Sequence, residues 1–213
     1  MRSADFLTVL RVGIVILVAY LIIMKFNPIA SIVLFAIALL LDGLDGFAAL
    51  HEESKGSVGF IEYAKYAFGG LTAKRREQVK LLKSRISSHY SYGPRMDVAG
   101  DRIVEYSMWA LFTFLHVIPL FVILIIIIRH SFADAFMGMK GTSSKLKTRI
   151  AQVVYGSNAS RAGINILKFL TFSYLMLAYV WEYPMAYGYA LVALLVTYIV
   201  ARGIAEIVEA FAE

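Results

Sequence analysis

Four aspartates occur in two short clusters whose spacing suits metal chemistry. Asp42 and Asp45 follow a long apolar run and are three positions apart, whereas Asp97 and Asp101 are four apart. In a helix, residues at these spacings lie on one face. Carboxylates gathered this closely repel one another unless a positive group lies between them. All-oxygen ligation suits Mg²⁺, Mn²⁺ or Ca²⁺, so the pattern predicts a divalent-cation site shared by two helices.

Other interpretations of these residues are open. Either pair of aspartates alone could face water at a helix end, or could pair with Arg95 and Arg102. Gly43 and Gly46 flank Asp45 and leave the helix surface nearly without side chains, so a bulky ligand can approach the backbone closely. Small residues also allow membrane helices to pack against each other. That packing explains the glycines but not their position among acidic residues.

The composition identifies the kind of protein that must position these acids. The chain has 213 residues, of which 60% are apolar and 17% charged, and it has no cysteine. Soluble domains are about 45–50% apolar and 25% charged. This composition excludes a disordered chain, a disulfide scaffold and a cysteine-ligated metal protein. An integral membrane protein remains, and its net charge of +6 is better explained by loops beside anionic lipid than by nucleic acid.

Six apolar runs approach the roughly 20 residues needed to cross a bilayer. The expected spans are 6–24, 29–50, 101–116, 119–137, 163–180 and 185–206. The predicted fold is therefore an all-α integral membrane protein with six transmembrane helices. The first run is long and lacks a small-residue cleavage site, so we expect no cleavable signal peptide.

The placement of lysine and arginine predicts the orientation. Segment 51–92 has eight basic residues against four glutamates, and segment 129–162 has six against Asp134. The turns between the other spans hold only Lys25 and Glu182. The positive-inside rule then places both long loops and both termini in the cytoplasm of a multi-pass protein of the cell membrane.

The first of these loops contains two further expected helices. Residues 57–72 mix aromatic with sparse charged side chains, and a basic run follows from Lys74 to Arg85. These helices would lie on the membrane surface or pack over a site. A small solvated helical lobe is the alternative.

The two acidic clusters together resemble the signature of the CDP-alcohol phosphatidyltransferase family. That signature reads D-x-x-D-G-x-x-A-R, then a short spacer and G-x-x-x-D-x-x-x-D; residues 42–49 read DGLDGFAA and residues 93–101 read GPRMDVAGD. Two features depart from it. Leu50 stands in place of the arginine, and the spacer is 51–92. We interpret 51–92 as a cytoplasmic insertion within a single domain, 1–213.

The spacer contains an incomplete copy of the second half of the signature. Gly59 lies at the customary distance, but Tyr63 and Ala67 stand where the aspartates would follow. The aspartate pattern returns only at Gly93. His51, Lys55 or a residue of this loop are candidates to replace the missing arginine.

The resemblance implies an enzyme of phospholipid biosynthesis. It would transfer a phosphatidyl or archaetidyl group from a CDP-activated lipid to an alcohol and release CMP. Asp42, Asp45, Asp97 and Asp101 would hold two Mg²⁺ or Mn²⁺ ions, with Asp101 as general base. Residues 5–11, DFLTVLR, resemble the N-x-x-T-x-x-R that opens many members. The implied CDP-binding residues are Thr8, Arg11, Gly46 and Ala49. The resemblance also suggests a homodimer.

A weaker resemblance concerns the acceptor. Residues 144–148, SKLKT, and Gln152 resemble the G-K-x-K-T-x-x-Q stretch of phosphatidylglycerophosphate synthases. This favours a phosphorylated acceptor such as glycerol 3-phosphate or inositol phosphate. The candidate acceptor-binding residues are Arg129, Lys145, Lys147 and Arg149, although the positive-inside rule also explains them. Two other functions stay open: a divalent-cation transporter that uses the same aspartates, and a catalytically inactive family member.

Overall fold

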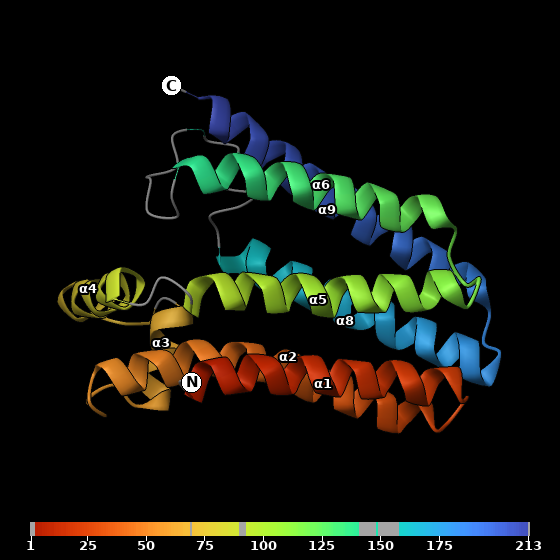
Figure 1. Cartoon of the computed structure of the whole chain (residues 1–213), viewed down its shortest axis with the longest axis horizontal. Coiled ribbons are helices and arrows are strands. Elements are labelled where there is room, and N and C mark those ends of the chain that lie inside the picture. Colours follow the sequence, from red (N-terminus) through yellow and green to blue (C-terminus); the bar gives the residue numbers. More distant parts are fainter. Residues whose placement is uncertain (1–2, 69, 90–92, 141–147, 149–157, 213) are drawn as a thin grey trace. The chain divides into compact units, whose positions relative to one another are not determined.

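A computed structural model describes residues 3–68, 70–89, 93–140, 148 and 158–212 (Figure 1). These residues form eight helices and no strand. The helices are α1 (Ser3–Ile23), α2 (Pro28–Glu53), α3 (Phe60–Phe68), α4 (Ala73–His89), α5 (Gly93–Phe114), α6 (Leu120–Lys140), α8 (Asn158–Trp181) and α9 (Met185–Phe211). The prediction of an all-helical fold is confirmed for this part of the chain.

Four of these helices are long and apolar enough to cross a membrane. They are Asp5–Ile23 in α1, all of α2, Ala162–Trp181 in α8 and all of α9. This agrees with an integral membrane protein. Spans through α5 and α6 stay a prediction.

The helix that contains the expected third span begins before that span. We expected the span to start near Asp101, and α5 begins at Gly93. A search for apolar residues misses these first turns because they carry Arg95, Asp97, Asp101 and Arg102 before the apolar half begins. As a result, both aspartates of the second cluster lie within one helix.

The chain divides into two compact units. Unit 1 comprises Met1–Leu21 and Ala30–Ser107, and unit 2 comprises Ile22–Ile29 and Met108–Glu213. All four signature aspartates belong to unit 1. In that unit α1 lies alongside α2, and the short helices α3 and α4 lie at the end of α2 (Figure 1). The candidate site is therefore described within unit 1.

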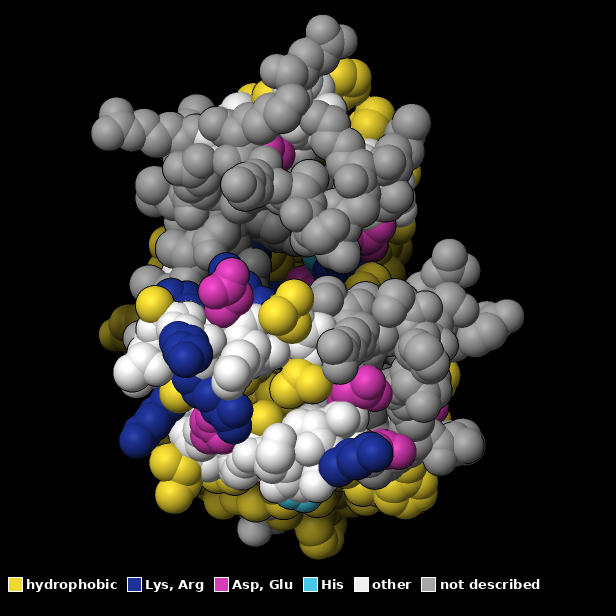
Figure 2. Space-filling model, turned by 90° about the vertical axis from the view of Figure 1, so that its left-hand side faces the viewer, with side chains coloured by type: hydrophobic (Ala, Val, Ile, Leu, Met, Phe, Trp, Pro, Cys, Tyr) yellow, Lys and Arg dark blue, Asp and Glu magenta, His cyan; other side chains and the backbone are white. Residues whose placement is uncertain are grey.

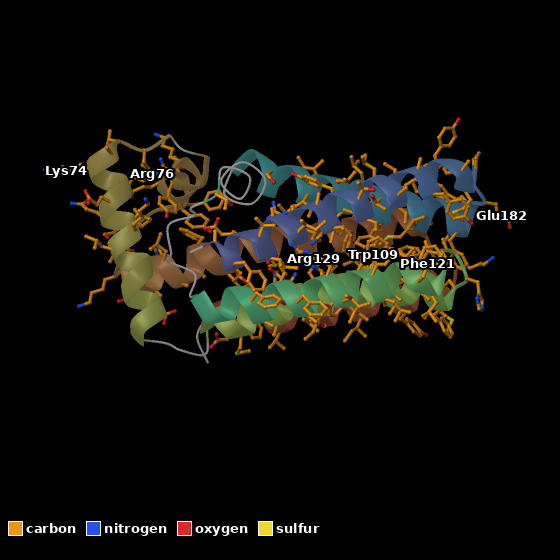
Figure 3. All side chains as sticks on the ribbon, turned by 90° about the horizontal axis from the view of Figure 1, so that it is seen from above. Lys74, Arg76, Trp109, Phe121, Arg129 and Glu182 are labelled. Carbon is orange, nitrogen blue, oxygen red and sulfur yellow. The ribbon has the colours of Figure 1, made fainter. Side chains whose placement is uncertain are left out.

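Unit 2 has an aromatic core, and its helices α6 and α8 each pack against α9. Trp109 and Phe172 are buried and meet edge to face with ring centroids 4.9 Å apart. Phe112 stacks on the same phenylalanine at 6.1 Å. Trp109 lies on α5 and is labelled in Figure 3. Such aromatic pairs add to the stabilisation that burial of apolar area provides.

The segment after α2 folds back onto the end of that helix. Gly56 has φ +82°, a left-handed conformation that favours glycine. The hydroxyl of Ser54 accepts a hydrogen bond from the backbone N–H of Val58 at 3.1 Å. This turn brings Val58 against Leu50, and both are fully buried with Val79 of α4. Tyr63, Tyr66, Leu71 and Leu82 pack against these three residues.

This small core explains the residue that departs from the signature. Leu50 is 0% exposed beneath α3 and α4, so its side chain cannot reach a ligand. His51, one candidate to replace the missing arginine, uses its Nδ1 in a 2.8 Å hydrogen bond with the carbonyl of Val58. Both residues therefore hold the chain that follows α2 against the end of that helix.

A partly exposed ion pair joins α3 to α4 and gives a prediction about pH. Arg75 of α4 donates to the carboxylate of Glu62 of α3, and this hydrogen bond holds the pKa of Glu62 below its usual range. The pair's contribution to stability is therefore complete above the unfolded pKa of about 4.3. This contribution is lost as the pH falls through the lowered pKa of Glu62 in the folded protein. We expect hydrogen exchange in α4 to quicken modestly over this acid range.

A Glu62→Gln variant should remove that acid-dependent step. Glu77→Gln is a suitable control because Glu77 is an exposed acid of α4. Lysine and arginine side chains gather over this end of the molecule (Figure 2), and Lys74 and Arg76 of α4 are both exposed. An unchanged pH profile in Glu62→Gln would show that the ion pair does not hold the two helices together.

Candidate functional site

Arg11 of α1 links the two aspartate clusters. Its Nη1 contacts the carboxylate of Asp42 on α2 and lies 2.9 Å from Oδ1 of Asp101 on α5. The arginine side chain is 2% exposed, whereas those of Asp42 and Asp101 are 32% and 50% exposed. A buried guanidinium thus holds two carboxylates that reach solvent. Such charge-assisted contacts are stronger than neutral hydrogen bonds.

Thr8 and Asp45 form the next contact along the same pair of helices. The Thr8 hydroxyl donates to Oδ2 of Asp45 at 3.4 Å, and both residues are buried. Thr8 precedes Arg11 by three residues, and Asp45 follows Asp42 by three. Because residues at this spacing share a helical face, antiparallel α1 and α2 can match Thr8 with Asp45 and Arg11 with Asp42. The sequence spacing therefore accounts for both contacts.

Gly100 allows α5 to approach α1. A Cβ atom at this position would lie 2.5 Å from Cγ2 of Thr8 and 2.7 Å from Nη2 of Arg11. Neither neighbour can yield easily, because both are buried and engaged with aspartates. Sequence reasoning missed Gly100. The feature of the sequence that could have identified this glycine is its position directly before Asp101.

The segment that contains Arg11 and the first aspartate pair is also similar to a known protein family. Residues 1–59 match the CDP-alcohol phosphatidyltransferase family model. The resemblance to this family is therefore confirmed over residues 1–59, and the match supports a general role in phosphatidyl transfer at a membrane. It does not confirm the phosphatidylglycerophosphate synthase subgroup. No curated protein and no solved structure matches the chain.

The family match covers only part of the predicted site. The matched segment contains Asp42 and Asp45 and ends before the second aspartate pair. Asp97 is a residue of α5, but its side chain is outside the described part of the structure. Gly46 and Ala49 lie on α2 and are partly exposed. Their roles, like those of the aspartates, stay predictions.

The residues predicted to bind the acceptor are only partly described. Arg129 of α6 donates through Nη2 to Oε2 of Glu206 at 2.9 Å and through Nε to the carbonyl of Ile199 at 3.1 Å. A Cβ at Gly203 would meet its side chain at 2.6 Å. These contacts join α6 to α9. Arg129 is labelled in Figure 3. Lys145, Lys147 and Arg149 fall outside the described residues.

The aspartates have the donor chemistry for the metal ions that the family uses. Asp42, Asp45 and Asp101 supply oxygen ligands, which suit hard divalent cations. Within the described residues, however, no three acidic, histidine or cysteine side chains form a group able to hold a metal ion. Arg11 is the cation that joins Asp42 to Asp101 there. A complete metal site would need Asp97 as well.

Proposed function

We propose that the chain transfers a phosphatidyl or archaetidyl group from a CDP-activated lipid to the hydroxyl of an alcohol, releasing CMP. The observation that carries this proposal is the bridge from Arg11 to Asp42 and Asp101, because it joins the two halves of the family signature across three helices. The family match over residues 1–59 supports the same chemistry. Nothing in the described residues favours a second function.

Asp101 is the proposed general base. The incoming hydroxyl oxygen would form a bond to the lipid-side phosphorus, and the bond from that phosphorus to the CMP oxygen would break. An Asp101 carboxylate oxygen would accept the hydroxyl proton. The side chain is half exposed, so an alcohol can reach it, and Arg11 fixes its orientation. Correct positioning of a base is the first requirement for proton transfer.

Asp42, Asp45, Asp97 and Asp101 are the proposed ligands for Mg²⁺ or Mn²⁺. When bound, two such ions would neutralise the charge of the diphosphate. Arg11 would hold Asp42 and Asp101 in place, and Thr8 would hold Asp45. Hydrogen bonds from neighbouring side chains keep the carboxylates that bind a metal ion in the correct geometry.

The proposed site faces the cytoplasm, and the proposed acceptor is a phosphorylated alcohol. The basic residues of 51–92 and 129–162 support this orientation through the positive-inside rule. The basic segment around Lys145 and Lys147 supports an anionic acceptor. Arg129 is a weaker candidate, because Glu206 already pairs with its charge.

The decisive experiment measures CMP release by the purified protein in lipid nanodiscs. The substrates would be CDP-diacylglycerol or CDP-archaeol, each with Mg²⁺ and one alcohol: glycerol 3-phosphate, inositol phosphate, inositol or serine. We expect CMP release with a phosphorylated alcohol and its loss on adding EDTA.

Two results would contradict the proposal. One is a folded protein that releases no CMP with any combination of lipid and alcohol. The other is Mg²⁺ flux into liposomes without CMP release, which would identify a transporter instead.

A further inference from the structure

Tyr63 of α3 reaches the backbone of Gly46 on α2. A Cβ atom at Gly46 would lie 2.6 Å from Oη and 3.6 Å from Cζ of Tyr63. Real Cβ atoms do not make contacts as short as the first, so the tyrosine hydroxyl occupies the space that any larger residue would need. Packing alone therefore accounts for a glycine at position 46, and the group packed there is a polar hydroxyl.

The ring of Tyr63 is held by apolar neighbours. Its centroid lies 5.7 Å from that of Phe47, which also meets Phe60 edge to face at 5.5 Å. The ring packs against the core formed by Leu50, Val58 and Val79. Because the ring is fixed on several sides, the direction of its hydroxyl is fixed as well. Removing only the hydroxyl should leave this packing intact.

The hydroxyl lies beside the acidic face of α2. Gly46 follows Asp45 directly and lies one helical turn after Asp42. Side chains at that spacing are about 5–6 Å apart between Cβ atoms. The Tyr63 hydroxyl therefore packs against a glycine one helical turn from Asp42, whose carboxylate Arg11 contacts. A nucleoside diphosphate bound at the aspartates is long enough to touch both positions.

We propose that Tyr63 is a substrate-binding residue that donates a hydrogen bond from its hydroxyl to the nucleoside diphosphate of the lipid substrate. This inference rests on the proposed function and adds a contact supplied by segment 51–92. A phenol is neutral at pH 7 and can donate to a phosphate oxygen. Gly46 and Tyr63 are both partly exposed, so solvent reaches this part of α2 and α3.

Tyr63→Phe tests the inference because it removes one oxygen and keeps the ring. Tyr66→Phe is the matched control: Tyr66 lies on the same helix and packs against the same core. We expect Tyr63→Phe to raise KM for CDP-diacylglycerol about tenfold with a smaller change in kcat, the effect of losing a hydrogen bond to a charged group. Thermal stabilisation by CDP with Mg²⁺ should weaken in parallel. Tyr66→Phe should leave both values near wild type.

The possible outcomes separate the two proposals. Wild-type KM and wild-type stabilisation by CDP in an active Tyr63→Phe enzyme would overturn the role of Tyr63 alone. An increased rate in Tyr63→Phe would also overturn it, since the hydroxyl would then obstruct the substrate. A wild-type protein that neither binds CDP nor releases CMP would instead refute the proposed function, and this inference with it.

Discussion

An Asp101→Asn variant should release CMP about a thousandfold more slowly than the wild type while remaining folded. General bases contribute about 10²–10⁴-fold, and the amide cannot accept the hydroxyl proton. The amide oxygen can still accept a hydrogen bond from Arg11, which lies 2.9 Å from Oδ1 in the wild type. Because the side chain is half exposed, the stability change should stay below about 1 kcal/mol. CMP release and thermal unfolding in detergent measure the two effects.

Asp134→Asn provides the control for Asp101→Asn. Asp134 is an exposed acid of α6 and is not among the proposed metal ligands or acceptor-binding residues, so it tests the loss of one carboxylate that the proposed mechanism does not use. Near-wild-type turnover in both variants would remove Asp101 from the mechanism. Loss of turnover in both would show that the assay responds to general changes of charge.

An Arg11→Gln variant should lose at least a hundredfold in CMP release and also lose stability. Without the guanidinium, Asp42 and Asp101 repel each other and leave their positions, and small displacements can cost about 10²-fold in rate. Removing one partner of a fully buried ion pair costs about 3–5 kcal/mol. Here the carboxylates are 32% and 50% exposed, so about 1–3 kcal/mol is expected.

Mg²⁺ distinguishes repulsion between the acids from a general packing defect in Arg11→Gln. If the carboxylates repel, Mg²⁺ should raise the unfolding temperature of this variant more than that of the wild type. Arg76→Gln, at an exposed arginine of α4, controls for the loss of one positive charge. Equal Mg²⁺ responses in wild type and Arg11→Gln would argue against Arg11 as the cation that keeps these aspartates together.

Much of the fold could be predicted from the sequence because apolar run length limits where membrane helices lie. The predicted runs 6–24 and 29–50 correspond to α1 and α2, and the tight turn at Lys25–Pro28 separates them. The start of α5 could not be predicted in this way, since its first turns are polar. Those turns contain the second aspartate pair, whose surroundings depend on another helix.

The contacts in the candidate site were harder to predict than its acids. Asp42 and Asp101 were identified from their spacing, but their contact with Arg11 was not. The matched spacings on α1 and α2 account for that contact only once the two helices are known to pack side by side. Gly100 and Tyr63 were missed as contributors to this region for the same reason. Each becomes evident only when its neighbour from another helix is known.

The burial of Leu50 has a consequence for evolutionary comparison. An arginine at this position would force a cationic group into the apolar space shared with Val58 and Val79, so the packing of α3 and α4 against α2 requires an apolar residue here. Related chains that carry a similarly long segment should therefore have an aliphatic residue after the DGxxA stretch. Chains with a short spacer should keep the arginine. A paired change of this kind would be a sequence marker for homologues that share this elaboration.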